Sequence, residues 1–131
     1  MKIINKEKLV GGIMENILSF LKCIGDKTRL KMLKLLLEDE FCVCQLTAIL
    51  DKSQSSISQH LRYFKDLELV NEKKDSKWTY YSINRKKYDE YLAKIFTLSG
   101  KSFGELNLEE MKERYEIVKS EKPCETRQKI N

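Results

Sequence analysis

The chain has 131 residues, of which 41% are hydrophobic and 34% are charged, and its formal net charge at pH 7 is +5. This balance is typical of a soluble, helix-rich globular protein and excludes a disordered chain. The apolar runs are too short to span a membrane and the charged N-terminus does not resemble a signal peptide, so we expect a cytoplasmic protein whose four cysteines are free thiols or metal ligands.

The excess positive charge is concentrated in about one third of the chain. Residues 53–87 contain eight Lys or Arg and four Asp or Glu, whereas residues 100–131 contain seven of each. A local cationic surface attracts polyanions, because contact with phosphates releases bound counterions. A solvated face without a partner would give the same count, so the charge alone does not decide between the two.

The first half of the chain is predicted to form four helices. Apolar residues recur at nearly helical spacing over residues 6–22, and Asp26 is suited to cap a second helix. The buried stripe of that helix is expected to consist of Leu30, Leu33, Leu36 and Leu37. A third helix is expected from Cys42 to Leu50. It would bury Val43, Leu46, Ile49 and Leu50.

The predicted fourth helix, capped by Ser53, has two contrasting faces. Its apolar face consists of Ile57, Leu61, Phe64 and Leu67. Its outer face carries Gln54, Ser55, Ser56, Ser58, Gln59, His60 and Arg62. A merely solvated helix usually carries Lys and Glu, whereas amide and hydroxyl groups are suited to reading base edges in the major groove. The alternative is a helix packed on a domain that does not bind DNA.

After the fourth helix the sequence pattern changes to a period of two. Residues 70–83 are predicted to form a β-hairpin with a turn at Asp75-Ser76. Lysines gather at its tip, namely Lys73, Lys74 and Lys77. Asn84 is suited to cap a helix that runs to about Leu98, and Asn107 to cap a last helix.

This order of elements predicts a mostly α-helical winged helix-turn-helix fold, with four helices, a β-hairpin, a fifth helix and a C-terminal helix. Residues 1–99 would form the DNA-binding and dimerisation domain, and residues 100–131 a C-terminal helix and a flexible tail. Three stretches resemble the ArsR/SmtB family of metal-responsive repressors, in particular its arsenic-responsive branch. They are GDKTRLKMLKLLLEDEFCVCQL, SQSSISQHLRYFKDLELV and KWTYYSIN. The resemblance implies a homodimer that binds double-stranded operator DNA and releases it when an inducer binds.

Cys42 and Cys44 are the candidate inducer ligands, because FCVCQL resembles the ELCVCDL box of arsenic- and cadmium-responsive members of that family. The structural alternative is a pair of small buried residues, since free cysteine is often buried. Helical residues two apart project about 200° apart, so both sulfurs cannot face one ion unless the first turn unwinds. Such unwinding would connect ligand binding to DNA release.

The sequence does not identify a third inducer ligand. Related arsenic sensors have a further cysteine three residues after the second, where this chain has Thr47. Members with zinc sites use His and carboxylates on the last core helix, where Asp89 and Glu90 are the candidates here. Cys124 is the better additional donor and Cys23 is expected to be mainly structural, while a small-molecule thiol is the other source.

We therefore expect a repressor that is not an enzyme and has no permanently bound cofactor. The expected inducer is As(III) or Sb(III), with Cd(II), Pb(II) and Zn(II) less favoured. The outer face of the fourth helix and the hairpin lysines would contact DNA, and the first and fifth helices would pair the subunits, without membrane association. Two alternatives stay open: a switch by oxidation or persulfidation of the two cysteines, and a dimeric interaction module without DNA function.

Overall fold

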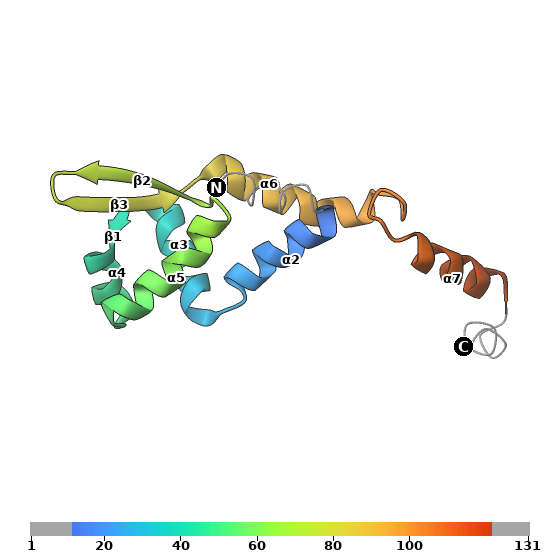
Figure 1. Cartoon of the computed structure of the whole chain (residues 1–131), viewed down its shortest axis with the longest axis horizontal. Coiled ribbons are helices and arrows are strands. Elements are labelled where there is room, and N and C mark those ends of the chain that lie inside the picture. Colours follow the sequence, from blue (N-terminus) through green and yellow to red (C-terminus); the bar gives the residue numbers. More distant parts are fainter. Residues whose placement is uncertain (1–11, 122–131) are drawn as a thin grey trace. The chain divides into compact units, whose positions relative to one another are not determined.

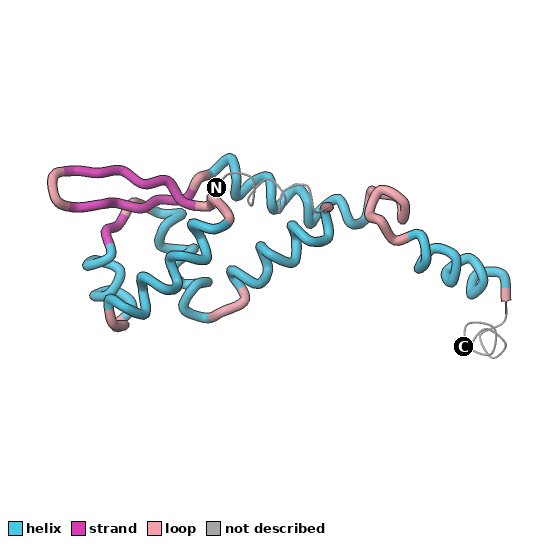
Figure 2. Tube along the Cα trace, in the orientation of Figure 1, coloured by secondary structure: helices cyan, strands magenta, loops and turns pink. Residues whose placement is uncertain are grey.

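Residues 12–121 are described in the computed structural model, so the predicted helix start near residue 6 and Cys124 lie outside the described part. The helices are α2 (Ile13–Ile24), α3 (Lys27–Glu38), α4 (Val43–Leu50), α5 (Gln54–Asp66), α6 (Arg85–Phe96), the 3-10 turn η1 (Thr97–Ser99) and α7 (Glu109–Ser120) (Figure 1). The strands are β1 (Phe41–Cys42), β2 (Val70–Asp75) and β3 (Trp78–Ile83), drawn in magenta in Figure 2. These elements fall into two compact units that divide between Phe96 and Thr97.

The caps of α3 and α5 are the predicted ones. A carboxylate oxygen of Asp26, the N-cap of α3, accepts a hydrogen bond from the backbone N–H of Arg29 at 3.1 Å. That bond is the main reason why the pKa of Asp26 lies below its usual range. At the start of α5, the hydroxyl of Ser53 accepts a bond from the N–H of Ser56 at 3.1 Å. Each cap satisfies one of the unpaired donors of a helix start, and so fixes where the helix begins.

Replacing Ser53 with alanine should lower the free energy of unfolding by about 1 kcal/mol, because the N–H of Ser56 loses its acceptor. Urea unfolding followed by circular dichroism measures the difference. Ser55→Ala is the matched control, since Ser55 is exposed and lies beyond the cap. Equal losses in the two variants would show that the cap bond does not stabilise α5.

The two later caps differ from each other. Asn84 caps α6 as predicted, and its side-chain oxygen accepts a bond from the N–H of Lys87 at 3.3 Å. The predicted cap at Asn107 is wrong. Asn107 takes a left-handed backbone conformation with φ of 60°, and Leu108 occupies the N-cap position of α7 without a side-chain cap bond. Asparagine tolerates this conformation well, so a residue type that suits a cap also suits a tight turn.

The sheet has three antiparallel strands in the order β1-β3-β2, whereas the sequence predicted only the hairpin. β1 pairs Phe41 with Tyr81 and Cys42 with Tyr80. The hairpin turn is formed by Ser76 and Lys77, one residue later than predicted, because Asp75 still pairs with Trp78. Ser76 has a positive φ of 59°, as a two-residue hairpin turn requires. The hairpin is thus anchored to the segment that leads into α4.

The core lies between the helices α2 to α6 and the sheet. Its fully buried side chains are Phe20, Cys23, Met32, Leu46, Ile57, Leu61, Phe64 and Leu69. Two predicted core residues are instead exposed, Leu30 to 53% and Ile49 to 51%. Met32 takes the core position of α3, so Leu30, two residues earlier on the helix, faces outward. Among residues 12–121, none of the helices has the length and apolar content that a bilayer crossing requires.

Candidate ligand pocket and nucleic-acid interface

The two candidate ligand cysteines lie at the junction between β1 and α4. Cys42 is not helical as predicted. It is the N-cap of α4, with an extended backbone at φ −86° and ψ 166°, and its N–H donates to the side-chain oxygen of Gln45 at 3.0 Å. Cys44 is exposed in the first turn of the helix. Two sulfurs two residues apart point about 200° apart only where both residues are helical. Because Cys42 is extended, this restriction does not hold for Cys42 and Cys44.

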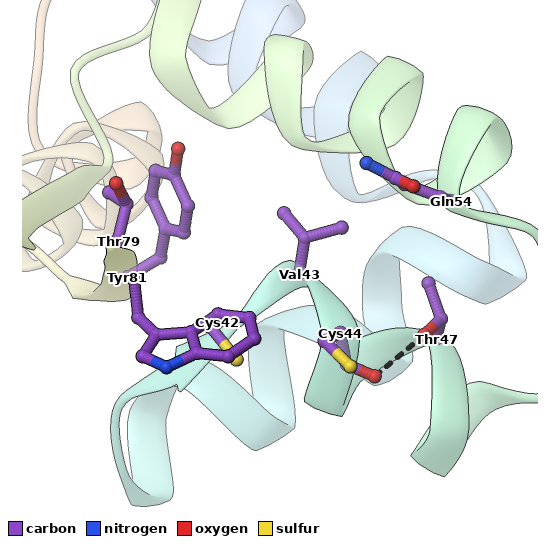
Figure 3. A pocket seen from close by; sticks show the side chains of 8 residues that line it. Cys42, Val43, Cys44, Thr47, Gln54, Thr79 and Tyr81 are labelled. Atoms are coloured by element: carbon purple, nitrogen blue, oxygen red, sulfur yellow. Dashed lines mark hydrogen bonds between the residues drawn. The ribbon is translucent and has the colours of Figure 1, made fainter. Parts of the chain in front are cut away.

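Both cysteines open into one pocket of about 490 Å³. Its walls come from β1, α4, the first residue of α5 and β3, and are formed by Cys42, Val43, Cys44, Thr47, Gln54, Trp78, Thr79 and Tyr81. Figure 3 shows Cys42 and Cys44 on one side, with Thr79 and Tyr81 of β3 and Gln54 of α5 around the space beside them. The sequence identified the cysteines but not this wall, because β3 reaches it only through its pairing with β1.

Further ligands for an ion do not gather at this pair within the described chain. In residues 12–121, no group of three or more His, Cys, Asp or Glu side chains is placed to hold a metal ion. Cys23 is fully buried, and burial raises the pKa of its thiol to about 12, because a low-dielectric core disfavours the thiolate. Cys23 thus has the properties of a structural residue, as expected.

Thr47 lies where related sensors have a further cysteine, and its hydroxyl donates to the backbone oxygen of Cys44 at 2.6 Å.

The predicted reading face of α5 is largely accessible. Gln54, Ser55, Ser58, Gln59 and Arg62 are exposed, and Ser56 is half-buried. The opposite face packs into the core. His60 differs from the rest: it is half-buried, and its Nδ1 lies 3.0 Å from Nη1 of Arg29 and 3.8 Å from a carboxylate oxygen of Asp26. The structure therefore places His60 against the start of α3, at the edge of the predicted reading face.

Arg29 connects three helices, and the sequence patterns did not identify it. Its guanidinium donates to the backbone oxygens of Lys22 and Cys23 at the end of α2. It also lies 3.8 Å from the ring centroid of Tyr63 on α5, where a cation and an aromatic face attract each other. Backbone acceptors carry no sequence signal, so this role of Arg29 is visible only in the fold.

The three lysines near the tip of the hairpin are exposed. Nζ of Lys73 lies 3.4 Å from a carboxylate oxygen of Glu40, and Nζ of Lys77 lies 5.2 Å from the ring centroid of Trp78. Exposed ion pairs of this kind contribute little to stability and exchange easily for another anion. The hairpin therefore presents a cationic surface on the same unit as α5.

Comparison with known proteins identifies relatives of this region. The family profile described as "Bacterial regulatory protein, arsR family" matches residues 26–72. The cadmium resistance transcriptional regulatory protein CadC of Listeria innocua is 39% identical over 79 residues, which cover 60% of this chain and 66% of that protein. The arsenic resistance transcriptional regulator ArsR1 of Pseudomonas putida is 37% identical over 78 residues, covering 56% and 61%. The chain thus spans less than two thirds of the length of these relatives.

Solved structures resemble the same region. HlyU from Vibrio cholerae matches with a TM-score of 0.50 and 32% identity over 60% of this chain and 87% of that chain. The homodimeric winged helix-turn-helix DNA-binding domain of Mb0332 from Mycobacterium bovis matches with a TM-score of 0.54 over 66% and 81%, at 18% identity, which shows the fold alone. The predicted winged helix-turn-helix fold is confirmed.

Proposed function

The chain belongs to the arsR family of bacterial regulatory proteins, and from this premise we propose that it is a homodimeric transcriptional repressor that releases operator DNA when a thiophilic ion binds Cys42 and Cys44. The family resemblance expected from the sequence is confirmed, and the relatives named above are regulators of transcription and not enzymes. One observation carries the proposal: Gln54, the first residue of α5, also lines the pocket of the two cysteines.

The DNA-binding part of the proposal rests on α5 and the hairpin. The exposed amides and hydroxyls in the first turns of α5 can donate to and accept from base edges in the major groove. A helix N-terminus also attracts phosphate. Lys73, Lys74 and Lys77 would contact the DNA backbone beside the groove. Gln59 and Arg62, one to two turns further along α5, would extend the contacts, and His60 would act at their edge.

The inducer part of the proposal rests on the pair of thiols. Soft thiolates select soft ions, and Cys42 and Cys44 supply two of them in one pocket. The two curated relatives are named for resistance to cadmium and to arsenic. We infer As(III) or Sb(III) as the inducer, ahead of Cd(II), Pb(II) or Zn(II). A three-sulfur site needs one donor beyond the two cysteines, whereas a four-ligand site needs two. Cys124 or a small-molecule thiol would supply the remaining bond to an inorganic ion.

The dimer part of the proposal rests on α2 and α6, which pack on each other through the stacked rings of Phe20 and Tyr91, 5.1 Å apart. Their outward faces still expose large apolar side chains, namely Leu18 and Leu21 on α2 and Phe96 on α6. A second copy would bury these side chains. The Mb0332 domain, of the same fold, is named as homodimeric.

The salt dependence of binding tests the DNA contacts. Binding to a duplex from the promoter of its own gene should weaken steeply as salt rises, with a log–log slope of about −0.9 for each phosphate contacted. Lys74→Gln should make this slope shallower by about 1. Fluorescence anisotropy of a labelled duplex gives both values.

Lys31→Gln is the matched control, because Lys31 is exposed on α3 and is not among the proposed DNA contacts. It removes the same charge and should leave the slope unchanged. If no duplex shows salt-sensitive binding, the chain is an interaction module and the repressor proposal is wrong. Mass spectrometry after mild oxidation separates the redox alternative from ion binding, since oxidation adds oxygen or sulfur to Cys42 or Cys44 or joins one of them in a disulfide, and ion binding makes none of these modifications.

A further inference from the structure

The ring of His60 on α5 has a defined hydrogen-bonding state, which follows from its contact with Arg29. Nδ1 of His60 lies 3.0 Å from Nη1 of Arg29, a normal distance for a hydrogen bond. A guanidinium has N–H donors and no acceptor, so the ring nitrogen must accept in this bond. A ring nitrogen accepts only when it carries no proton. Nδ1 of His60 is therefore unprotonated.

Asp26 is the competing partner for Nδ1, and the distances favour Arg29. A carboxylate oxygen of Asp26 lies 3.8 Å from Nδ1, which is too long for a hydrogen bond. The same carboxylate already accepts from the backbone N–H of Arg29 in the cap of α3. A proton on Nδ1 would face the guanidinium at the shorter distance and the carboxylate at the longer one. The contact with Arg29 therefore decides the state of the ring.

Other contacts hold the guanidinium of Arg29 in this position. Its Nε donates to the backbone oxygen of Cys23, and its Nη2 donates to that of Lys22 at 3.3 Å, both at the end of α2. The central carbon of the guanidinium lies 3.8 Å from the ring centroid of Tyr63, one turn after His60 on α5. Such a rigid group loses little freedom when it makes one more bond. Nη1 is thus held in place for Nδ1 of His60.

The accepting role of Nδ1 determines what the other ring nitrogen can do. In a neutral imidazole one nitrogen carries the proton, so Nε2 of His60 is the N–H donor. Within residues 12–121 Nε2 has no hydrogen-bond partner, and none of the buried side-chain nitrogens of that range lacks one. Nε2 is therefore accessible, in line with a side chain that is 21% exposed. It presents a fixed donor at the edge of the reading face of α5.

A donor at this edge suits a phosphate oxygen better than a base. The residues placed to read bases lie in the first turns of α5, whereas His60 lies against the start of α3. Backbone phosphates line the rims of the major groove, and most hydrogen bonds from proteins to DNA go to phosphate and sugar. The carboxylate of Asp26 would repel a phosphate, but the guanidinium of Arg29 beside it offsets that charge.

We propose that Nε2–H of His60 donates to a backbone phosphate of the operator, and that Arg29 is the positioning residue that fixes the ring in the tautomer this bond requires. This deepens the proposed function and rests on its assignment of α5 as the reading helix. Phosphate contacts fix the register of a reading helix on the duplex. Because Arg29 also bonds to the end of α2, the contact is set relative to a helix proposed to pair the subunits.

NMR of the ring nitrogens tests the role of Arg29, because His60 is the only histidine of the chain. The full chain, labelled with ¹⁵N-histidine, is measured at a pH high enough that the ring shifts no longer change. The wild-type chain should show one tautomer, with the proton on Nε2. Arg29→Met removes the donors and should give shifts averaged over both tautomers. Lys31→Met is the matched control on α3 and should keep the wild-type shifts. A proton on Nδ1 in the wild-type chain would overturn the proposal.

Anisotropy of labelled duplexes at the same pH tests the phosphate contact. His60→Asn keeps an acceptor near the position of Nδ1 and has no donor at that of Nε2, so the affinity should fall about tenfold. A promoter duplex and an unrelated duplex should lose the same factor, because a phosphate carries no sequence information. The salt slope should stay unchanged, unlike that of Lys74→Gln, since a neutral ring releases no counterion. A shallower slope would show that the ring binds as a cation, contrary to the proposal.

The same titrations distinguish this inference from the proposed function. If the wild-type chain shows steep salt dependence and His60→Asn binds equally well, the phosphate contact is wrong and the proposed function stands. A loss confined to the promoter duplex would assign His60 to a base and would also overturn the phosphate contact. If no duplex shows salt-sensitive binding, both proposals are wrong. Should Arg29→Met not fold, the tautomer of the wild-type chain and the affinities of His60→Asn still decide.

Discussion

Replacing both Cys42 and Cys44 with serine should leave operator binding intact and raise the arsenite concentration needed for release by on the order of 100-fold, near the upper end of usual coupling between two sites. A serine hydroxyl is a hard, weak donor and does not replace a thiolate as a ligand for As(III). The fold should persist, because the cap bond at Cys42 comes from its backbone N–H to Gln45 and is kept in the variant.

Anisotropy of a labelled duplex, titrated with arsenite at constant protein concentration, measures the shift. Thr47→Ser is a suitable control, since it changes a neighbouring pocket residue and keeps both thiols and the hydroxyl that bonds to the backbone of Cys44. It should release DNA as the wild-type chain does. Normal release from the double-serine variant would exclude the cysteine pair as the sensor.

Replacing Phe64 with alanine should lower the free energy of unfolding by about 3–5 kcal/mol, because it removes a fully buried ring and leaves a cavity. Domains of this kind have a total stability of only about 5–15 kcal/mol, so the variant would be close to unfolding. Phe64 holds α5 on the core next to Ile57 and Leu61. Operator binding should therefore weaken together with stability.

Urea unfolding followed by far-UV circular dichroism gives the free energy. Leu30→Ala is the matched control, because it removes an apolar side chain that is 53% exposed, and its effect should stay within about 0.5 kcal/mol. If Leu30→Ala destabilises the chain as strongly as Phe64→Ala, then Leu30 is buried in solution, as its spacing in the sequence suggested.

Features set by neighbouring residues were predictable from the sequence. The caps at Asp26 and Ser53, the polar and apolar faces of α5 and the alternating hairpin depend on interactions within a few residues. Asn107 shows the limit of such rules, because one residue type suits both a cap and a left-handed turn. Leu30 shows another limit. Leu30 and Met32 are both apolar and lie two residues apart on α3, and packing buries Met32 and leaves Leu30 exposed.

The sequence pointed to the two cysteines of the candidate site but not to the shape of the pocket around them. The spacing of Cys42 and Cys44 pointed to a sensor, but the sequence assigned both to one helix. The strand pair between Cys42 and Tyr80 joins residues 38 positions apart, and no local pattern encodes such a contact. The same pairing brings Trp78 and Tyr81 to the pocket, so the apolar part of its lining was also not predictable from the sequence.

The shortness of β1 has a kinetic consequence. A strand of two residues adds few backbone pairs, and such segments open locally at a small fraction of the free energy of global unfolding. Cys42 can therefore separate from Tyr80 while Phe64 and the rest of the core stay in place. Local openings of this kind occur on timescales from microseconds to seconds. A ligand could then gain access to Cys42 without unfolding of the core, and each molecule could be used many times without refolding.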